Sequence, residues 1–221
     1  MPKESCLIVV PVYNGEKFIP QFLGRMPDQF LHNLLFVDDG STDSTDSVLQ
    51  SKGVKYISHE RNKGKGRAIR TGVHHAVQKG FDYVLTIDAD LQHPPECIKD
   101  FLFSMNENAV CIGMRTDYST MPVKRRFSNI STSLLLTLRT GKLIKDSQCG
   151  FRLFPVKAFD GLNFVEDGFQ YESEFLIKAG LLGYEINHIS IPTIYGVENS
   201  AMRNISDTLK FIAMYFKSFF W

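Results

Sequence analysis

Short apolar runs alternate with helical segments through the first half of the chain, and this alternation constrains the fold more than any other feature. The pattern predicts strands at 6–12, 34–37, 54–58, 83–88 and 109–114, with helices at 15–25, 42–51, 64–79 and from about 94 onward. Elements spaced in this way predict an α/β fold with a doubly wound, mostly parallel, Rossmann-like sheet. In such sheets, ligands bind beyond the carboxyl ends of the strands.

Polar residues follow three of the predicted strands. The three clusters are Tyr13-Asn14-Gly15-Glu16, Asp38-Asp39-Gly40-Ser41 and Asp88-Ala89-Asp90-Leu91-Gln92. Asp, Asn and Gly are common in turns, so an ordinary turn would explain any single cluster. Three clusters at one edge of a parallel sheet are better explained by a binding site.

The third cluster has the composition of a metal site. If the chain stays extended there, Asp88, Asp90 and Gln92 point the same way, because side chains alternate along a strand. Two carboxylates and an amide oxygen are hard ligands suited to Mg²⁺ or Mn²⁺ bridging a diphosphate. The metal would neutralise charge on a departing nucleoside diphosphate. A strand-end turn or a helix cap is the alternative, and the motif favours the metal.

The second cluster places two acids, Asp38 and Asp39, beside an apolar strand, where each needs a partner. A ribose hydroxyl or a base N–H would serve, by analogy with acids in other nucleotide-binding sheets. Ser41, Thr42 and Asp43 are better explained as N-caps of the next helix.

A basic, glycine-containing loop, Arg61-Asn62-Lys63-Gly64-Lys65-Gly66, opens the helix at 64–79. Backbone N–H groups and the helix dipole favour phosphate at such a place, so Lys65 is a candidate nucleotide ligand. The full phosphate-loop spacing is absent. Pro11-Val12-Tyr13-Asn14 also replaces the dinucleotide fingerprint after the first strand, which argues against an NAD enzyme.

After Met114 the alternation breaks down. A loop is predicted at 116–121, a basic run at 124–126, and a helix at 128–140 whose leucines 134, 135, 136 and 138 favour a buried position. A strand at 150–154, a helix at 171–182 and a strand at 184–191 follow. No linker or repeat interrupts the chain. We therefore expect a single domain, with a nucleotide-sugar half at 1–115, an acceptor half at 116–203 and an amphipathic helix at 204–221.

The last helix has apolar residues at helical spacing between Ile205 and Trp221, with Asp207, Lys210 and Lys217 elsewhere around it. Two interpretations stay open. The helix packs on the domain, or it lies in a membrane interface, where aromatic residues and lysines are favoured.

Composition narrows the class of protein. The chain has 221 residues and a formal net charge of +1, which argues against a nucleic-acid binder. Its four cysteines, Cys6, Cys97, Cys111 and Cys149, have neither zinc nor disulfide spacing. No signal peptide and no stretch long enough to span a bilayer are visible. We therefore expect a cytoplasmic protein, at most at the cytoplasmic face of a membrane.

Taken together, the motifs resemble the family 2 glycosyltransferases with the GT-A fold, particularly the dolichol-phosphate mannose synthase-like and polyprenyl-phosphate sugar synthase branch. The matching segments are Val9–Asn14, Val37–Asp43, Asn62–Gly66, Asp88–Glu96 and Cys149–Phe154. They run in family order from residue 7 to about 155, and an acceptor-side α+β extension is expected beyond the nucleotide half.

The resemblance implies roles for particular residues. Pro11, Tyr13, Glu16 and Asp39 would line the base and ribose pocket, and Asp88 and Asp90 would hold the metal with Gln92 as an additional ligand. Arg115 and Arg126 fall where the branch places arginines for donor and acceptor phosphates. Asp146 lies near the expected acceptor, and Arg203 resembles a late basic residue that closes over the donor.

The family implies an inverting transfer from a UDP- or GDP-sugar, with Asp90 in the catalytic set. A lipid-phosphate acceptor is already anionic and needs no strong base, whereas a sugar hydroxyl needs a carboxylate to take its proton. Asp146, Glu172 and Glu174 are the candidate bases, with Asp146 slightly ahead. Glu172 and Glu174 cannot share one helix face, so at most one should point into the cleft, and the other is expected to be a solvated helix acid.

Other activities share part of this pattern. A transferase that acts on a glycan hydroxyl in cell-surface polysaccharide synthesis would have the same donor site. A sugar-1-phosphate nucleotidyltransferase would need a glycine-rich, arginine-containing loop after the first strand, which is absent. A non-catalytic nucleotide-binding module would not need the pair Asp88 and Asp90.

Overall fold

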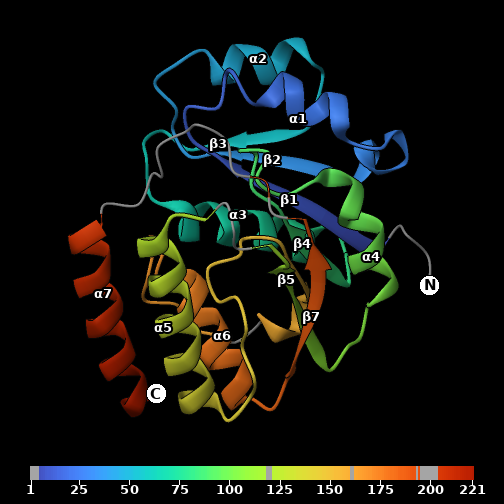
Figure 1. Cartoon of the computed structure of the whole chain (residues 1–221). Helices are drawn as coiled ribbons and strands as arrows, with labels where there is room; N and C mark the ends of the chain where they lie inside the picture. The colour runs from blue at the N-terminus through green and yellow to red at the C-terminus, as the bar shows by residue number, and fades with distance from the viewer. Residues whose placement is uncertain (1–4, 118–120, 160–161, 193, 195–203) are drawn as a thin grey trace.

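Seven strands form one sheet in the computed structural model, which describes residues 5–117, 121–159, 162–192, 194 and 204–221. The strands are β1 (Cys6–Val12), β2 (Leu34–Asp38), β3 (Tyr56–Ser58), β4 (Tyr83–Thr86), β5 (Ala109–Arg115), β6 (Arg152–Pro155) and β7 (Glu185–Ile191). They lie in the order β3-β2-β1-β4-β6-β5-β7 (Figure 1). Only β6 runs antiparallel to its neighbours, so the predicted mostly parallel sheet is confirmed.

The centre of the sheet consists of β1, β2 and β4. Every residue of β2 and β4 is buried, and so is every residue of β1 except the half-buried Pro11. Continuous apolar strands of this kind fit parallel strands that are covered on both faces. Val12 pairs with Asp38 in register, so the polar residues that follow the two strands come out side by side.

The second half of the chain completes the same sheet. Strand β6 lies between β4 and β5, with Arg152 opposite Thr86 on one side and Ile112 on the other. Strand β7 pairs along the whole of β5. The predicted nucleotide and acceptor halves are thus joined by shared strands.

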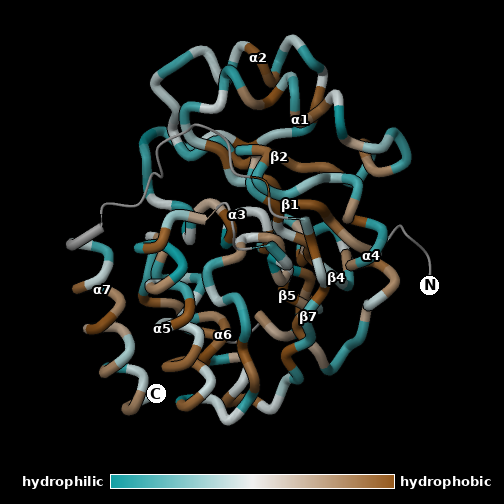
Figure 2. The backbone as a smooth tube through the Cα atoms, viewed as in Figure 1, coloured by the Kyte–Doolittle hydropathy of each residue, from teal (hydrophilic) through white to brown (hydrophobic). Residues whose placement is uncertain are grey.

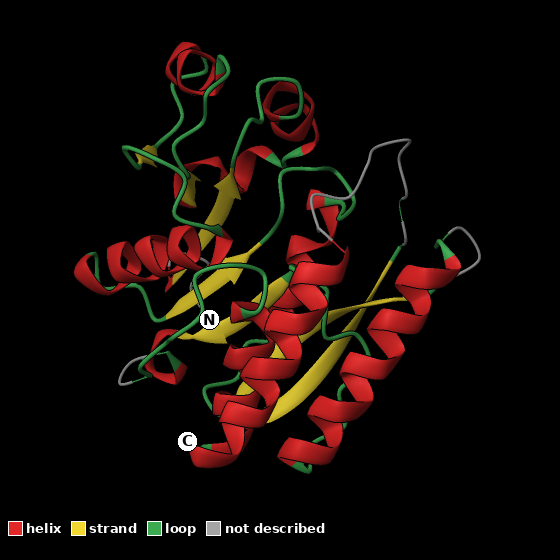
Figure 3. Cartoon of the chain, turned by 90° about the vertical axis from the view of Figure 1, so that its left-hand side faces the viewer, coloured by secondary structure: helices red, strands yellow, loops and turns green. Residues whose placement is uncertain are grey.

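Helices cover both sides of the sheet (Figures 1 and 3). They are α1 (Ile19–Arg25), α2 (Thr45–Ser51), α3 (Lys65–Gln78), α4 (Ile98–Phe103), α5 (Val123–Thr140), α6 (Tyr171–Leu181) and α7 (Asn204–Lys217), with 3-10 turns at Asp28–Asn33, Pro95–Cys97, Val156–Ala158 and Ser218–Phe220. Helix α3 packs on β1 and β2, and α6 packs against α3, α5 and α7. No helix of these described residues is long and apolar enough to cross a membrane.

Helix α5 differs from its prediction in length and in burial. It begins at Val123 directly after Pro122, and it ends at Gly141, whose positive φ of 67° suits a helix C-terminus. Leu136 is buried, but Leu134 and Leu138 are exposed. The expected buried helix is therefore wrong, because α5 lies on the outside of α6 and only one of its sides meets the domain. Hydrophobic segments show along both α5 and α7 in Figure 2.

The metal-site motif also has a different backbone from the one predicted. Strand β4 ends at Thr86, and the chain then turns, with Leu91 at a positive φ of 62°. The N–H of Gln92 donates to Oδ1 of Asp90 across 3.0 Å. Asp88, Asp90 and Gln92 are therefore carried on a turn and do not alternate along an extended strand.

Helix α2 starts later than expected. It begins at Thr45 after Ser44, whose side chain makes no capping bond. Asp43 Oδ1 accepts a hydrogen bond from the N–H of Thr45 at 3.0 Å, while Ser41 and Thr42 donate to Asp38 and Asn14. The expected capping by Ser41 and Thr42 is wrong, because these residues tie the ends of β1 and β2 together.

Candidate active site

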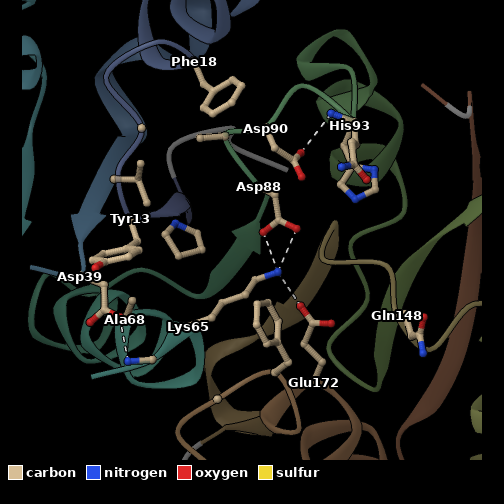
Figure 4. A pocket seen from close by; sticks show the side chains of 18 of the residues that line it. Tyr13, Phe18, Asp39, Lys65, Ala68, Asp88, Asp90, His93, Gln148 and Glu172 are labelled. Carbon is tan, nitrogen blue, oxygen red and sulfur yellow. Dashed lines mark hydrogen bonds and ion pairs between the residues drawn. The ribbon is translucent and has the colours of Figure 1, made fainter. Parts of the chain in front are cut away.

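A pocket of about 700 Å³ opens at the carboxyl ends of β1, β2 and β4. Tyr13, Asp39 and Asp88 line it from the first half of the chain, and Glu172 and Gln148 line it from the second (Figure 4). Parallel strands end at one edge of a sheet, which is why segments far apart in the sequence meet here. The predicted convergence of the three polar clusters is confirmed.

Lys65 forms the centre of the pocket floor. Its Nζ lies 2.7 Å from Oδ1 of Asp88 and 2.6 Å from Oε1 of Glu172, as the dashed lines in Figure 4 show. Burial alone would lower the pKa of Lys65, but the two carboxylates outweigh it and raise the pKa above its usual range. Burial would likewise raise the pKa of Asp88, yet the Lys65 ammonium lowers it. Lys65 and Asp88 are therefore both charged at neutral pH.

Asp90 lies in the pocket without a cation at hydrogen-bond distance among the described residues. Burial and the negative charge of Asp88 raise the pKa of Asp90 to about 6. The Gln92 N–H partly offsets this, because it stabilises the ionised carboxylate. A carboxylate in this state is electrostatically suited to receive a cation, since a cation would relieve its repulsion with Asp88.

Gly150 brings the start of β6 close to this charge cluster. A Cβ atom at Gly150 would lie 2.4 Å from Oδ2 of Asp88 and 2.8 Å from Nζ of Lys65. The hydroxyl of Thr86 donates to the carbonyl oxygen of Gly150 at 2.9 Å, which holds the two strands together at this point. A side chain at this position would enter the ion pair and force Asp88 or Lys65 to shift.

Asp39 closes the loop before α3. Its carboxylate accepts hydrogen bonds from the N–H groups of Lys63 at 3.0 Å and Gly64 at 2.7 Å, and it lies 2.7 Å from Nδ1 of His59. Asp39 is almost fully buried but still lines the pocket. The N–H groups of Lys63 and Gly64, which we expected to bind phosphate, therefore donate to the Asp39 carboxylate.

The remaining residues predicted on the nucleotide side divide into two groups. Pro11 and Tyr13 line the pocket, and Tyr13 is 47% exposed there. Glu16 does not line it, because Oε2 of Glu16 accepts a hydrogen bond from the N–H of Ser44 at 3.0 Å, just before α2. Phe18 lines the pocket as well, although nothing in its sequence context distinguished it from a core residue (Figure 4).

Arg115 and Asp146 form a buried pair at the far side of the pocket. Nε of Arg115 donates to Oδ2 of Asp146 at 2.7 Å and its second terminal nitrogen to Oδ1 at 2.7 Å, while Asn129 donates to Oδ1 at 2.9 Å. Asp146 has no exposed surface, whereas Arg115 lines the pocket. A carboxylate that is so enclosed orients Arg115 and is poorly placed to take a proton from an acceptor.

The basic run at the start of α5 has a defined register. Arg125 lines the pocket, whereas Arg126 is exposed and does not. Arg125 rather than Arg126 therefore reaches the pocket, because neighbouring residues on a helix point in different directions. Arg203 lies outside the described residues.

Two acids of α6 point in different directions. Glu172 lines the pocket, and Glu174 turns away to accept the N–H groups of Val165 at 2.9 Å and Glu166 at 2.8 Å. The prediction that at most one of them enters the cleft is confirmed. The expectation that the other is solvated is wrong, because the segment before α6 covers Glu174 completely.

Arg152 connects the segments that bring Glu172 and Gln148 to the pocket. Its guanidinium donates to the carbonyl oxygens of Ser147 at 2.7 Å, Cys149 at 2.8 Å and Glu172 at 2.7 Å. Sequence reasoning quoted Arg152 only as part of a motif. Arg152 is buried at the start of β6, where its guanidinium lies within hydrogen-bond distance of all three carbonyl oxygens.

The matched segments identify the family. The family model described as "Glycosyl transferase family 2" matches residues 7–162. The chain belongs to glycosyl transferase family 2. An uncharacterised protein of Methanocaldococcus jannaschii is 31% identical over 201 residues, which cover 87% of this chain and 83% of that protein. UDP-N-acetylglucosamine–dolichyl-phosphate N-acetylglucosaminyltransferase of Methanococcus voltae is 30% identical, covering 97% of this chain and 95% of that protein.

Solved structures agree with the family assignment at the level of the fold. Glucosyl-3-phosphoglycerate synthase from Mycobacterium tuberculosis, in complex with UDP, superposes with a TM-score of 0.75 at 19% sequence identity. The match covers 97% of this chain and 79% of that one. The predicted GT-A fold of this family 2 glycosyltransferase is confirmed.

Among the described residues, no three His, Cys, Asp or Glu side chains are placed so that they could hold a metal ion together. The predicted set has two carboxylates and an amide, and Lys65 now pairs with one of the carboxylates. Met121 and Phe169 also line the pocket. Neither stood out in the sequence, because both belong to irregular segments without a motif.

Proposed function

We propose that this protein transfers a sugar from a nucleoside-diphosphate sugar to a polyprenyl phosphate, with inversion at the anomeric carbon. The relative from Methanococcus voltae that aligns along 97% of the chain is named for such a reaction, with UDP-N-acetylglucosamine and dolichyl phosphate. A second relative, from Shewanella sediminis, is an undecaprenyl-phosphate 4-deoxy-4-formamido-L-arabinose transferase, 30% identical over 66% of this chain and 47% of its own.

The observation that carries this proposal is that two of the three candidate bases are held in ion pairs, while the third, Glu174, turns away from the pocket. Asp146 is held by Arg115, and Glu172 is held by Lys65. A sugar hydroxyl needs a base that can accept its proton, whereas a phosphate oxygen attacks without one. A pocket in which Asp88 and Glu172 are paired with Lys65, Asp90 is assigned to the cation, and Arg115 and Arg125 contribute positive charge favours the anionic acceptor.

The acidic turn fits a divalent cation. Asp88, Asp90 and Gln92 offer the hard oxygen atoms that Mg²⁺ and Mn²⁺ prefer, and the raised pKa of Asp90 reflects negative charge that a cation would relieve. A bound metal would neutralise the charge of the departing diphosphate. Titration of the protein with Mn²⁺, followed by calorimetry, tests this set directly.

We assign the following roles to the residues that line the pocket. Pro11 and Tyr13 provide a wall for the base, and Arg115 and Arg125 would orient the acceptor phosphate. The new bond joins the anomeric carbon to an acceptor phosphate oxygen, and the bond from that carbon to the donor diphosphate breaks. The products are a sugar-phosphate lipid and a nucleoside diphosphate. No proton has to be removed.

A panel of UDP-, GDP- and dTDP-sugars with Mn²⁺, with and without polyprenyl phosphate, tests the proposal. We expect a lipid-linked sugar with inverted configuration, first of all from UDP-N-acetylglucosamine. Transfer to a sugar hydroxyl with none to polyprenyl phosphate would contradict it. Retained configuration would contradict the inverting mechanism alone.

A polyprenyl phosphate resides in a membrane, so the protein has to contact that membrane. We propose that it does so at the cytoplasmic face. Helix α7 supports this, because Phe216, Phe219 and Phe220 are exposed on it and on the turn that follows. Flotation of the chain with liposomes, compared with a version that ends near Ser206, tests the contact. Equal behaviour of the two in solution would count against it.

A further inference from the structure

A second helix, α5, exposes an apolar stripe that no part of the described chain covers. Val123, Phe127, Ile130, Leu134 and Leu138 are between 54% and 82% exposed. They follow one another at intervals of three or four residues, so they lie along one side of the helix. Soluble proteins normally expose large apolar side chains singly, and a continuous stripe marks an interaction surface.

Helix α7 continues this surface. Its own stripe, extended by the turn after it, consists of Leu209, Ile212, Phe216 and Phe219, which are between 43% and 64% exposed. The two helices lie side by side in Figures 1 and 3. Arg139 of α5 joins them at one end, where it donates to Oγ of Ser218 at 3.2 Å and its guanidinium carbon lies 4.9 Å from the centre of the Phe219 ring.

The charge around the two apolar stripes indicates which kind of partner this surface would bind. Helix α5 contains Lys124, Arg125, Arg126 and Arg139 and no acidic residue, while the whole chain has a net charge of only +1. The remainder of the chain is therefore net acidic. An apolar stripe flanked by basic residues matches the surface of an anionic bilayer. A second copy of the chain would present the same positive charge and be repelled.

The first turn of α5 connects this surface to the pocket. Arg125 lines the pocket, whereas Val123 and Phe127, two residues before and after it, are exposed. Residues two apart on a helix point to opposite sides, so the pocket lies across the first turn of α5 from these two exposed side chains.

We propose that α5 and α7 together form one membrane-docking surface, which seats the protein on an anionic bilayer with the first turn of α5 between that bilayer and the pocket. The surface itself is defined by exposure and charge. Its use in delivering the acceptor rests on the proposed function.

The test uses the full chain and sedimentation with phosphatidylcholine vesicles, with and without phosphatidylglycerol. The α5 variants are Phe127→Glu and Leu134→Glu, and the α7 variant is Phe216→Glu. Phe103→Glu is the matched control, because Phe103 is 86% exposed on α4, on the opposite side of the molecule from α5 and α7 (Figure 1). All four positions are exposed, so the variants should fold, which circular dichroism and the melting temperature would verify.

We expect the wild type and Phe103→Glu to bind anionic vesicles equally and to be released by salt. Each of the other variants should bind about tenfold more weakly, because it places a charge in the apolar contact. Wild-type binding that Phe127→Glu and Leu134→Glu leave unchanged would overturn the role of α5. A wild-type dimer in light scattering that these variants dissociate, without vesicle binding, would assign the surface to a second copy.

A short-chain, water-soluble prenyl phosphate separates this inference from the proposed function. Phe127→Glu should use it as well as the wild type does, and should lose turnover only with acceptor held in vesicles. Vesicle binding without any transfer by the wild type would refute the proposed function and leave the docking surface standing. Transfer to vesicle-held acceptor that is equal in Phe127→Glu and wild type would refute the docking surface alone.

Discussion

Replacement of Lys65 by methionine tests the electrostatic centre of the pocket. Met keeps most of the side-chain volume and removes the charge that lies 2.7 Å from Asp88 and 2.6 Å from Glu172. Lys63→Met is the matched control, because Lys63 is an exposed lysine of the same loop whose side chain has no carboxylate partner among the described residues. The two variants therefore differ in the ion pairs and little else.

The structure sets the expected magnitude. The side chains of Lys65, Asp88 and Glu172 are 17%, 23% and 8% exposed, so the pairs are largely shielded from water. Removal of one partner of a buried pair costs about 3–5 kcal/mol, and the partial exposure of Asp88 points to the lower end, about 3 kcal/mol. For a domain of this size, about 3 kcal/mol corresponds to a fall in melting temperature of about 6–12 °C.

The effect should depend on pH in a defined direction. Without Lys65, the two neighbouring carboxylates repel each other, and at least one has a folded-state pKa above its unfolded value. A raised carboxyl pKa stabilises the fold only at low pH, so the variant loses most stability at about pH 8 and less at about pH 5. Thermal unfolding of both variants at these two pH values is the assay. A melting temperature of Lys65→Met close to that of Lys63→Met at about pH 8 would refute the reasoning.

Three further predictions concern the same pocket. Because the pKa of Asp90 is raised to about 6, Mn²⁺ affinity measured by calorimetry should fall as pH drops through about 6, and Asp90→Asn should abolish this dependence; affinity independent of pH would contradict it. Gly150→Ala would place Cβ 2.4 Å from Oδ2 of Asp88, and we expect turnover to fall by about tenfold or more, so unchanged turnover would contradict the placement. Asp146→Asn should destabilise the protein by about 3 kcal/mol and raise KM for the acceptor, since it releases Arg115, whereas a loss confined to kcat would identify a base instead.

Local sequence patterns predicted the parts of the site that lie directly after strands. The clusters at 13–16, 38–41 and 88–92 were visible because apolar runs end there, and parallel strands bring their ends together. Contacts between distant segments were not predictable in this way. The pairing of Lys65 with Glu172 joins residues on two helices, and no local pattern relates them.

Two features that the sequence left open or mispredicted have a common physical origin. The choice between Arg125 and Arg126 depends on the rotation of α5, and so does the exposure of Leu134 and Leu138. The sequence predicts a helix there, but its rotation is set by packing against α6. An apolar run on a helix can face the core or a bilayer, since periodicity alone does not distinguish these environments.

The antiparallel strand β6 has a consequence for how the chain folds during synthesis. Among the described residues, strand β5 pairs in the sheet with β6 and β7, so residues 109–115 lack a neighbouring strand until the chain has been made as far as about residue 155. The nucleotide half, which emerges from the ribosome first, would expose the edge of β4 during that interval. A nascent chain stalled after residue 115 should therefore bind chaperones, and one extended past residue 191 should release them.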